Sequence, residues 1–376
     1  MARSELNSLR QRLPENAGKV LDLLRKHIVT GKMPPGERFP TRLEMRAKYK
    51  LAAETVQKIF NSLIQDGFAT PRGMAGTFVS QTPPHLTSVG LVFAGLSANW
   101  SRFDTALFNE ASSLEDGRNL KLRIYRKVHY PSNYVDHIRL LEDVAAWRVG
   151  GLIFINPPRP ETIKQILERA PTMPCVSIWD QPEFPHVAAV ALGSKFTTKA
   201  MEYFASRQRQ RVAFLNTWSP LDFAQQFDAA LLAEAEAHGL TTQPQWMLQV
   251  HLDAAPSAQD ITHLLFSNPE DRPDAFFITD DNLVEHATRG LLAAGVRVPE
   301  DVEVVAHANF PWPTPSAVLA QRLGYDAREI IQNCLDVLAR IRNHADVSAP
   351  TLIPARFAHE VETKPSPLTP TPDPYP

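Results

Sequence analysis

The sequence predicts an α/β protein, in which a small helical module precedes a large body of parallel sheets covered by helices. Two observations lead to this prediction. Charge is divided unevenly along the chain: residues 1–80 carry 14 Lys+Arg and 7 Asp+Glu, whereas the rest carries 25 and 34. From residue 89 onward, short apolar segments alternate with amphipathic ones, which is typical of strands connected by helices across parallel sheets.

The first module is expected to contain three helices and a hairpin. A helix over residues 17–30 has apolar residues at helical spacing, and the prolines of segment 31–36 end it. Helices over 43–49 and 54–66 follow, the last ended by a glycine, and residues 68–80 form two short strands around a turn. This order predicts a winged helix-turn-helix. The excess positive charge suggests a module that meets a polyanion, although a solvated helical surface is the alternative.

The body is expected to begin after a linker at residues 81–88, which is stiffened by prolines. Residues 89–360 suit two α/β lobes with a cleft between them, and the proline-rich tail 361–376 is expected to be disordered. Candidate strands are Val89–Phe93, Leu120–Tyr125, Gly151–Ile155, Cys175–Ile178, Val212–Leu215, Ala275–Ile278 and Val302–Ala306. Candidate helices include Phe196–Arg207, Asp222–His238 and Asp326–Arg342.

Two carboxylates, Asp280 and Asp281, directly follow the apolar strand 275–278. Ligands of open α/β sheets bind at the carboxyl ends of the strands, so this acidic loop is a candidate binding site. The alternative is that an acid in this loop caps the helix that follows. Capping is the expected role of Asp280.

Several classes of protein are disfavoured by the sequence. No apolar run reaches the roughly 18 residues of a membrane helix, and residues 1–19 lack the apolar core of a signal peptide, which predicts a cytoplasmic protein. Cys175 and Cys334 suggest neither a disulfide framework nor a thiolate metal site. The histidines show no metal spacing, and no nucleophile elbow, P-loop or H-E-x-x-H helix occurs. We therefore expect no metal, no cofactor and no enzymatic activity.

Five short motifs follow one another in the first module: Ile28-Val29-Thr30-Gly31, Pro35-Gly36-Glu37-Arg38-Phe39-Pro40-Thr41, Thr55-Val56, Asp66-Gly67-Phe68 and Gly76-Thr77-Phe78-Val79. In this order and spacing they resemble the GntR family of bacterial transcription regulators. The resemblance implies that the third helix enters the major groove of DNA and that the wing lies along the backbone.

The resemblance also implies which residues contact DNA. Ala52, Ala53 and Gln57 stand where the family has Ser-Arg and a further Arg, so base readout is expected to be unusual or weak. Candidate base and wing contacts are Thr41, Arg42, Glu54, Thr55, Gln57, Lys58, Gly76 and Thr77. Candidate phosphate contacts are Lys48, Lys50 and Arg72. The alternatives are solvated surface charges and, for Thr55, a helix-start hydroxyl.

The stretch from Pro273 to Val305, with weaker matches at 149–154, 174–176, 211–215 and 237–240, resembles the effector domain of LacI-type regulators. That domain is itself related to periplasmic sugar-binding proteins. The resemblance implies a dimeric transcription regulator, a repressor or an activator, that binds operator DNA under the control of a small-molecule effector between the lobes. A sugar or related metabolite is the implied effector. The alternative is an enzyme or a ligand-binding protein on the same two-lobed scaffold.

The implied effector contacts start with Asp281, which aligns with the family's ligand-binding acid and can accept two hydroxyls. Trp100 and Phe103 are candidate stacking faces or ordinary core residues, and Asn156 and Asp180 are candidate rim contacts. Two further candidates mark departures from the family. Phe227 stands near the position of the family's sugar-binding Arg, and Asn309 ends a segment that replaces Gly-Phe-Asp-Asp. These departures leave open another sugar, a glycoside or a ligand that is not a sugar.

Overall fold

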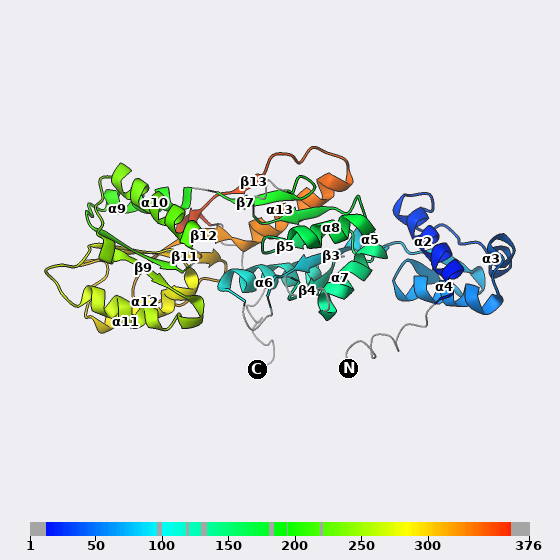
Figure 1. The fold of residues 1–376 in the computed structure, drawn as a ribbon, viewed down its shortest axis with the longest axis horizontal. Helices are drawn as coiled ribbons and strands as arrows, with labels where there is room; N and C mark the ends of the chain where they lie inside the picture. The colour runs from blue at the N-terminus through cyan, green and yellow to red at the C-terminus, as the bar shows by residue number, and fades with distance from the viewer. Residues whose placement is uncertain are drawn as a thin grey trace, which may run out of the picture. The chain divides into compact units, whose positions relative to one another are not determined.

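The computed structural model describes residues 13–95, 100–117, 120–128, 134–179, 184–193, 195–218 and 221–361 (Figure 1). Asp180 and residues 362–376 of the proline-rich tail lie outside these ranges. The chain forms two compact units, each assembled from separate segments. The first unit comprises the chain up to residue 100, residues 107–191 and 331–351, and the second comprises residues 101–106, 192–330 and the chain from 352.

Three helices and a hairpin open the first unit, which confirms the predicted winged helix-turn-helix. The helices are α2 Glu15–Val29, α3 Arg42–Tyr49 and α4 Ala53–Gln65. Strands β1 Ala69–Pro71 and β2 Thr77–Val79 pair antiparallel to form the wing. Apolar residues at helical spacing on α2 and α4, such as Leu24 and Ile59, are buried in one common core because each helix turns a single apolar face inward.

A six-stranded sheet follows, in the order β13-β7-β6-β5-β3-β4. Its strands are β3 Ser88–Val92, β4 Lys121–Tyr125, β5 Leu152–Phe154, β6 Cys175–Ser177, β7 Ala188–Leu192 and β13 Thr351–Ile353. The pairs among β3 to β7 are parallel. The helices in this part of the chain are α5 Pro84–Thr87, α6 Arg102–Gly117, α7 Val135–Ala145, α8 Pro160–Arg169 and α13 Ala327–Arg342.

The second unit contains another six-stranded sheet, in the order β14-β12-β11-β10-β8-β9. Its strands are β8 Val212–Thr217, β9 Met247–Val250, β10 Ala275–Ile278, β11 Glu303–Phe310, β12 Gln321–Asp326 and β14 Arg356–Phe357. Its helices are α9 Lys195–Ser206, α10 Leu221–Ala237, α11 Ser257–Phe266 and α12 Asp281–Ala293. All strand pairs are parallel except β12 with β14.

The two sheets confirm the predicted α/β class, and they add strands that the sequence analysis did not predict. These strands are β7, β9, β12, β13 and β14. The strand predicted to end at Ala306 continues to Phe310, because β12 pairs with β11 as far as this residue. This extension places His307 and Asn309 within the sheet. None of the helices in the described ranges has the length and apolar character needed to cross a membrane.

Candidate functional site

The candidate DNA-contacting residues lie on α3, on α4 and in the hairpin, as the winged helix-turn-helix requires. The exposed ones are Thr41, Arg42, Lys48, Lys50, Glu54 and Arg72, and the half-buried ones are Thr55, Gln57, Lys58, Gly76 and Thr77. Helix α4 also carries a row of buried residues on the opposite side, including Val56 and Leu63. One side of α4 is therefore fixed by the core while the other remains accessible to a partner.

Several candidate side chains have partners within the module. The amide nitrogen of Glu44 donates to the Thr41 hydroxyl at 3.3 Å, and the Thr41 amide donates to a Glu44 carboxylate oxygen at 2.7 Å. This reciprocal capping box starts α3, and the backbone hydrogen bond from Thr41 lowers the pKa of Glu44. On α4, Lys58 lies 3.1 Å from a Glu54 carboxylate oxygen. The DNA-binding role of Thr41, Glu54 and Lys58 stays a prediction. A base contacted by one of these side chains would compete with the Thr41–Glu44 hydrogen bonds or with the Glu54–Lys58 ion pair.

A further basic residue, Arg38, lies beside the wing. Arg38 is exposed and forms a backbone bridge with Phe78 of β2, so its side chain stands beside the turn of the hairpin. The guanidinium of Arg72 lies over the Phe78 ring at 4.6 Å from the centroid. Arg38 belongs to the second of the five short motifs of the first module, and this motif is the sequence signal that marks it.

The acidic loop of the second unit divides its two carboxylates between two tasks. Asp280 is the N-cap of α12 and accepts a hydrogen bond from the Asn282 amide at 2.9 Å, which confirms its expected capping role. Burial and, secondly, the charge of Asp281 raise the pKa of Asp280. Since Asp280 caps the helix, Asp281 does not perform that structural task and remains the candidate ligand group.

Asp281 is buried, with 1% of its surface exposed, and lies beside the end of β11. The side-chain amide of Asn309 donates to its Oδ2 at 2.7 Å, and the Nδ1 atom of His307 lies 3.8 Å from its Oδ1. Within the described residues, the Asn309 Oδ1 and the His307 Nδ1 are buried and have no hydrogen-bond partner. Buried polar atoms are almost always satisfied, so these two atoms point to a partner outside the protein, such as a ligand or water.

Further polar residues surround the carboxyl ends of these strands. Arg322 donates through Nη2 to the Thr314 carbonyl at 2.6 Å, and burial lowers its pKa while the charge of Asp281 opposes this shift. At the neighbouring strand ends, Asp228 accepts hydrogen bonds from Asn216 at 3.1 Å and from Gln249 at 2.9 Å. No local pattern in the sequence marks these residues as parts of a site. Their proximity depends on strand pairing rather than on spacing in the sequence.

The predicted Phe227 is half-buried on α10, next to Asp228 in sequence. Phe227 stands near the position of a family arginine, whereas the adjacent carboxylate of Asp228 carries no comparable signal in the sequence. Phe103 is half-buried near the start of α6. Contacts of Phe227 and Phe103 with an effector stay predictions.

In the first unit, Trp100 and Asn156 lie beyond the carboxyl ends of β3 and β5. The ring of Trp100 stacks on Phe93 with centroids 4.1 Å apart, and the Asn156 Oδ1 accepts a hydrogen bond from the Ala94 amide at 2.9 Å. Core packing therefore engages one face of Trp100, although the side chain is only half-buried. Contacts of Trp100 and Asn156 with an effector remain predictions. Asp180, the last effector candidate, lies outside the described residues.

No set of three or more His, Cys, Asp or Glu side chains is grouped as a metal site would require within the part of the chain that the structure describes. The chemistry at the β10 and β11 strand ends is instead that of hydrogen bonding. It combines a carboxylate, an amide, an imidazole and a guanidinium, which suits a polar organic ligand.

Comparison with protein families gives two matches. Residues 16–79 match the model of bacterial regulatory proteins of the gntR family, and residues 201–357 match a periplasmic binding protein-like domain. The first match spans the three helices and the hairpin. The second covers most of the second unit, including Asp281 and Asn309.

Curated relatives are similar over parts of their length. The HTH-type transcriptional repressor PurR of Aliivibrio salmonicida is 24% identical over 174 residues, which are 45% of this chain and 51% of that protein. The HTH-type transcriptional regulator Rv1152 of Mycobacterium tuberculosis is 35% identical over 78 residues, 19% of this chain and 64% of that protein. The chain spans between about a fifth and about half of the length of the PurR relatives it matches.

Solved structures of LacI-type regulators share the fold of the body. A LacI family regulator from Arthrobacter sp. FB24 in complex with lactose has a TM-score of 0.57 and 18% identity over 72% of this chain and 97% of that one. A complex of the transcriptional regulator CelR with cellobiose has a TM-score of 0.53 and is 17% identical, over 82% of this chain and 90% of that one. The chain therefore joins a regulatory domain of the gntR family, at residues 16–79, to a periplasmic binding protein-like domain.

Proposed function

We propose that the chain is a transcription regulator that binds specific DNA sequences and responds to a small-molecule effector. The observation that carries the proposal is the presence of both domains in one chain, a gntR-type winged helix-turn-helix and a periplasmic binding protein-like domain. Two of the similar proteins are themselves called a transcriptional repressor and a transcriptional regulator. Repression is the mode that the PurR relatives support. An enzymatic role has no such support.

The DNA-binding role is supported by charge and by exposure. The module of residues 1–80 carries 14 Lys+Arg against 7 Asp+Glu, and the exposed candidate phosphate contacts at α3 and in the wing are Lys48, Lys50 and Arg72. Such residues neutralise phosphates and release counterions, so the affinity for DNA is expected to fall steeply with salt. Gln57 and Lys58 on α4 are the proposed base readers, because α4 is the helix that enters the major groove in this fold.

The effector-binding role is supported by the site around Asp281. A buried carboxylate, an Asn309 Oδ1 and a His307 Nδ1 without partners in the described residues can receive and position ligand hydroxyls. Because similar structures hold lactose, cellobiose, glucose and sucrose, we propose a sugar or a related metabolite as the effector. The effector controls DNA binding by favouring one of two conformations of the protein.

We also propose a homodimer in the cytoplasm, because regulators of this kind place two modules on two half-sites. The proposed boundaries are residues 1–80 for the DNA-binding domain, 81–88 for the linker, 89–360 for the effector-binding domain and 361–376 for the tail. Sedimentation of the full chain at micromolar concentration tests the dimer, and a purely monomeric species contradicts it.

A gel shift with the full chain and DNA from its own promoter region tests the function. We expect a complex that weakens with salt, and Arg42→Ala should weaken it at every salt concentration. Arg159→Ala is the matched control, because Arg159 is an exposed arginine outside the module. If the wild-type chain shows no sequence preference, the proposed DNA-binding function is wrong. If Arg42→Ala binds as well as Arg159→Ala, Arg42 is not one of the DNA contacts. A thermal-shift screen with the four sugars tests the effector, since a ligand of the native state raises its melting temperature.

A further inference from the structure

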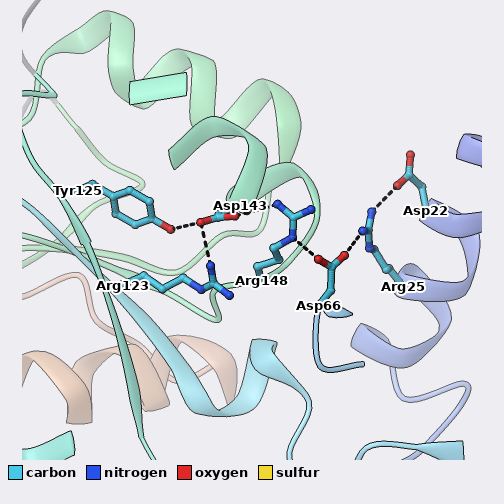
Figure 2. A network of polar contacts seen from close by, with 7 residues as sticks. All are labelled: Asp22, Arg25, Asp66, Arg123, Tyr125, Asp143 and Arg148. Carbon is cyan, nitrogen blue, oxygen red and sulfur yellow. Dashed lines mark hydrogen bonds and ion pairs between the residues drawn. The ribbon is translucent and has the colours of Figure 1, made fainter. Parts of the chain in front are cut away.

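A network of seven charged and polar side chains connects the winged helix-turn-helix with the first sheet (Figure 2). Arg25 of α2 pairs with Asp22 at 3.1 Å and also with Asp66, the residue that ends α4. Arg148, in the turn between α7 and β5, donates through Nε to the second Asp66 oxygen at 2.8 Å. The two oxygens of Asp66 thus bind two arginines from different parts of the first unit.

The network of polar contacts continues through α7 to strand β4 of the first sheet. Nη1 of Arg148 donates to Asp143 of α7 at 2.9 Å, and the other oxygen of Asp143 accepts from the Tyr125 hydroxyl at 2.8 Å. Arg123 of β4 also approaches that oxygen, at 3.3 Å. Figure 2 shows these contacts as one unbroken series from Asp22 to Tyr125. Arg148 is the member that bonds both to the winged helix-turn-helix, through Asp66, and to α7, through Asp143.

The four side chains in the middle of this series are largely removed from water. The side chains of Arg25, Asp66, Asp143 and Arg148 are exposed by only 8%, 12%, 3% and 17%. Exposed ion pairs contribute little to stability, but removing one partner from a buried pair leaves an uncompensated charge. A contact of this kind holds two elements in place more firmly than a surface pair does.

Apolar contacts accompany the ion pairs at the same place. Trp147, next to Arg148, packs against both the core of the winged helix-turn-helix and the core of the first sheet. Its φ of 53° is unusual for a bulky residue and persists only where the surroundings fix it. At Gly150, a Cβ would lie 1.9 Å from the His85 carbonyl oxygen. The backbone of the turn at 147–150 therefore packs directly against the backbone of α5, with no room for a side chain between them. The His85 ring in turn stacks on Phe68, with centroids 6.2 Å apart.

We propose that Asp66, Arg148 and Trp147 dock the winged helix-turn-helix on the first sheet, so that α4 and the turn at 147–150 move as one body. Arg148 is the positioning residue, because it alone among the described arginines bonds to both Asp66 and Asp143. Residues 81–88 are then a fixed connection and not a free tether. A change in the first sheet would reach the end of α4 through Asp66. The docking itself needs neither DNA nor effector, so it can be tested apart from the proposed function.

The test is hydrogen–deuterium exchange of the full chain without DNA or ligand. Arg148→Met removes both charged hydrogen bonds of Arg148 while keeping its apolar length. Loss of such bonds predicts that the amides of residues 80–90 exchange about tenfold faster or more. Arg123→Met is the matched control, because Arg123 also binds Asp143 but does not contact Asp66. Exchange of residues 80–90 should stay at the wild-type rate in this control.

A double-mutant cycle with Asp66→Asn distinguishes a direct pair from a general loss of stability. If Asp66 and Arg148 act together, adding Asp66→Asn to Arg148→Met accelerates exchange by much less than Asp66→Asn does in the wild-type chain. Independent effects of the two substitutions, or unchanged exchange in Arg148→Met, would overturn the proposal. If Arg148→Met does not fold, Arg148→Lys replaces it, because one ammonium cannot hold both carboxylates in the geometry of the guanidinium.

Discussion

Replacement of Asp281 separates ligand binding from structural support at the acidic loop. Asp281 is buried and accepts a hydrogen bond from Asn309, whereas Asp280 caps α12. Asp281→Asn removes the charge but keeps an oxygen that can accept from Asn309. Asp281→Ala removes both. The two variants therefore report on different parts of the site.

The expected sizes follow from these contacts. A hydrogen bond to a charged group is worth about 1.5–3 kcal/mol, so Asp281→Asn should weaken effector binding by roughly tenfold to a hundredfold. Its effect on stability should be small. Asp281→Ala should also cost about 1–3 kcal/mol of unfolding free energy, since it leaves the buried Asn309 amide unpaired. Asp280→Ala is the control and should cost about 1 kcal/mol through the lost cap, with little change in affinity.

Isothermal titration with the sugar found in the thermal-shift screen measures affinity, and denaturant unfolding measures stability. An Asp281→Asn variant that binds the effector as tightly as the wild type would show that Asp281 is not a ligand group. An Asp280→Ala variant that loses more affinity than Asp281→Asn would show that the ligand contacts the capping carboxylate instead.

Three further predictions concern stability. Burial lowers the pKa of His85 to about 4 in the folded protein, below the unfolded value of about 6.5. The unfolded state therefore binds a proton more readily, and the free energy of unfolding should fall by about 3 kcal/mol as the pH falls from above 6.5 to 4. Urea unfolding at pH 7 and pH 4.5 should show a smaller loss for His85→Gln than for the wild type. Gly324→Ala would place a Cβ 1.8 Å from the Ala308 carbonyl oxygen and should lower the free energy of unfolding by about 1–3 kcal/mol or more. Gly18→Ala is the matched control: it adds a Cβ in open space on α2 and should raise the free energy of unfolding by about 0.5–1 kcal/mol. A stabilised or unchanged Gly324→Ala in thermal unfolding contradicts the close approach. Thr41→Ala removes a capping box and should cost about 1 kcal/mol, and a melting temperature equal to that of the wild type would show that the cap contributes nothing.

Elements with a strong local signal were predicted from the sequence. Helix α4 has apolar residues at helical spacing, and β10 is a short apolar run between polar segments, so both were placed within a residue or two. Strand β12 was missed, because Gln321–Asp326 combines charged residues with a glycine and has a low intrinsic strand preference. Its strand conformation depends on pairing with β11, which no local pattern reveals.

The same distinction applies to the candidate site. Asp281 was predicted because it directly follows an apolar strand, and the capping role of Asp280 was predicted from its place before a helix. The grouping of Asp281 with His307 and Arg322 was not predicted, since pairing in the sheet brings these distant positions together. The Asp66–Arg148 pair, 82 residues apart, had no signal in the sequence for the same reason.

The discontinuous make-up of the first unit has a consequence for synthesis on the ribosome. Residues 331–351 belong to this unit but are translated only after residues 192–330 of the second unit. The buried Ile331, Cys334 and Leu338 in that late segment are part of its apolar interior. At about 5–20 residues per second, the nascent first unit waits roughly 7–30 seconds for them. During this interval, the surface that α13 later covers is open to chaperones, whereas the winged helix-turn-helix has all its residues from the start.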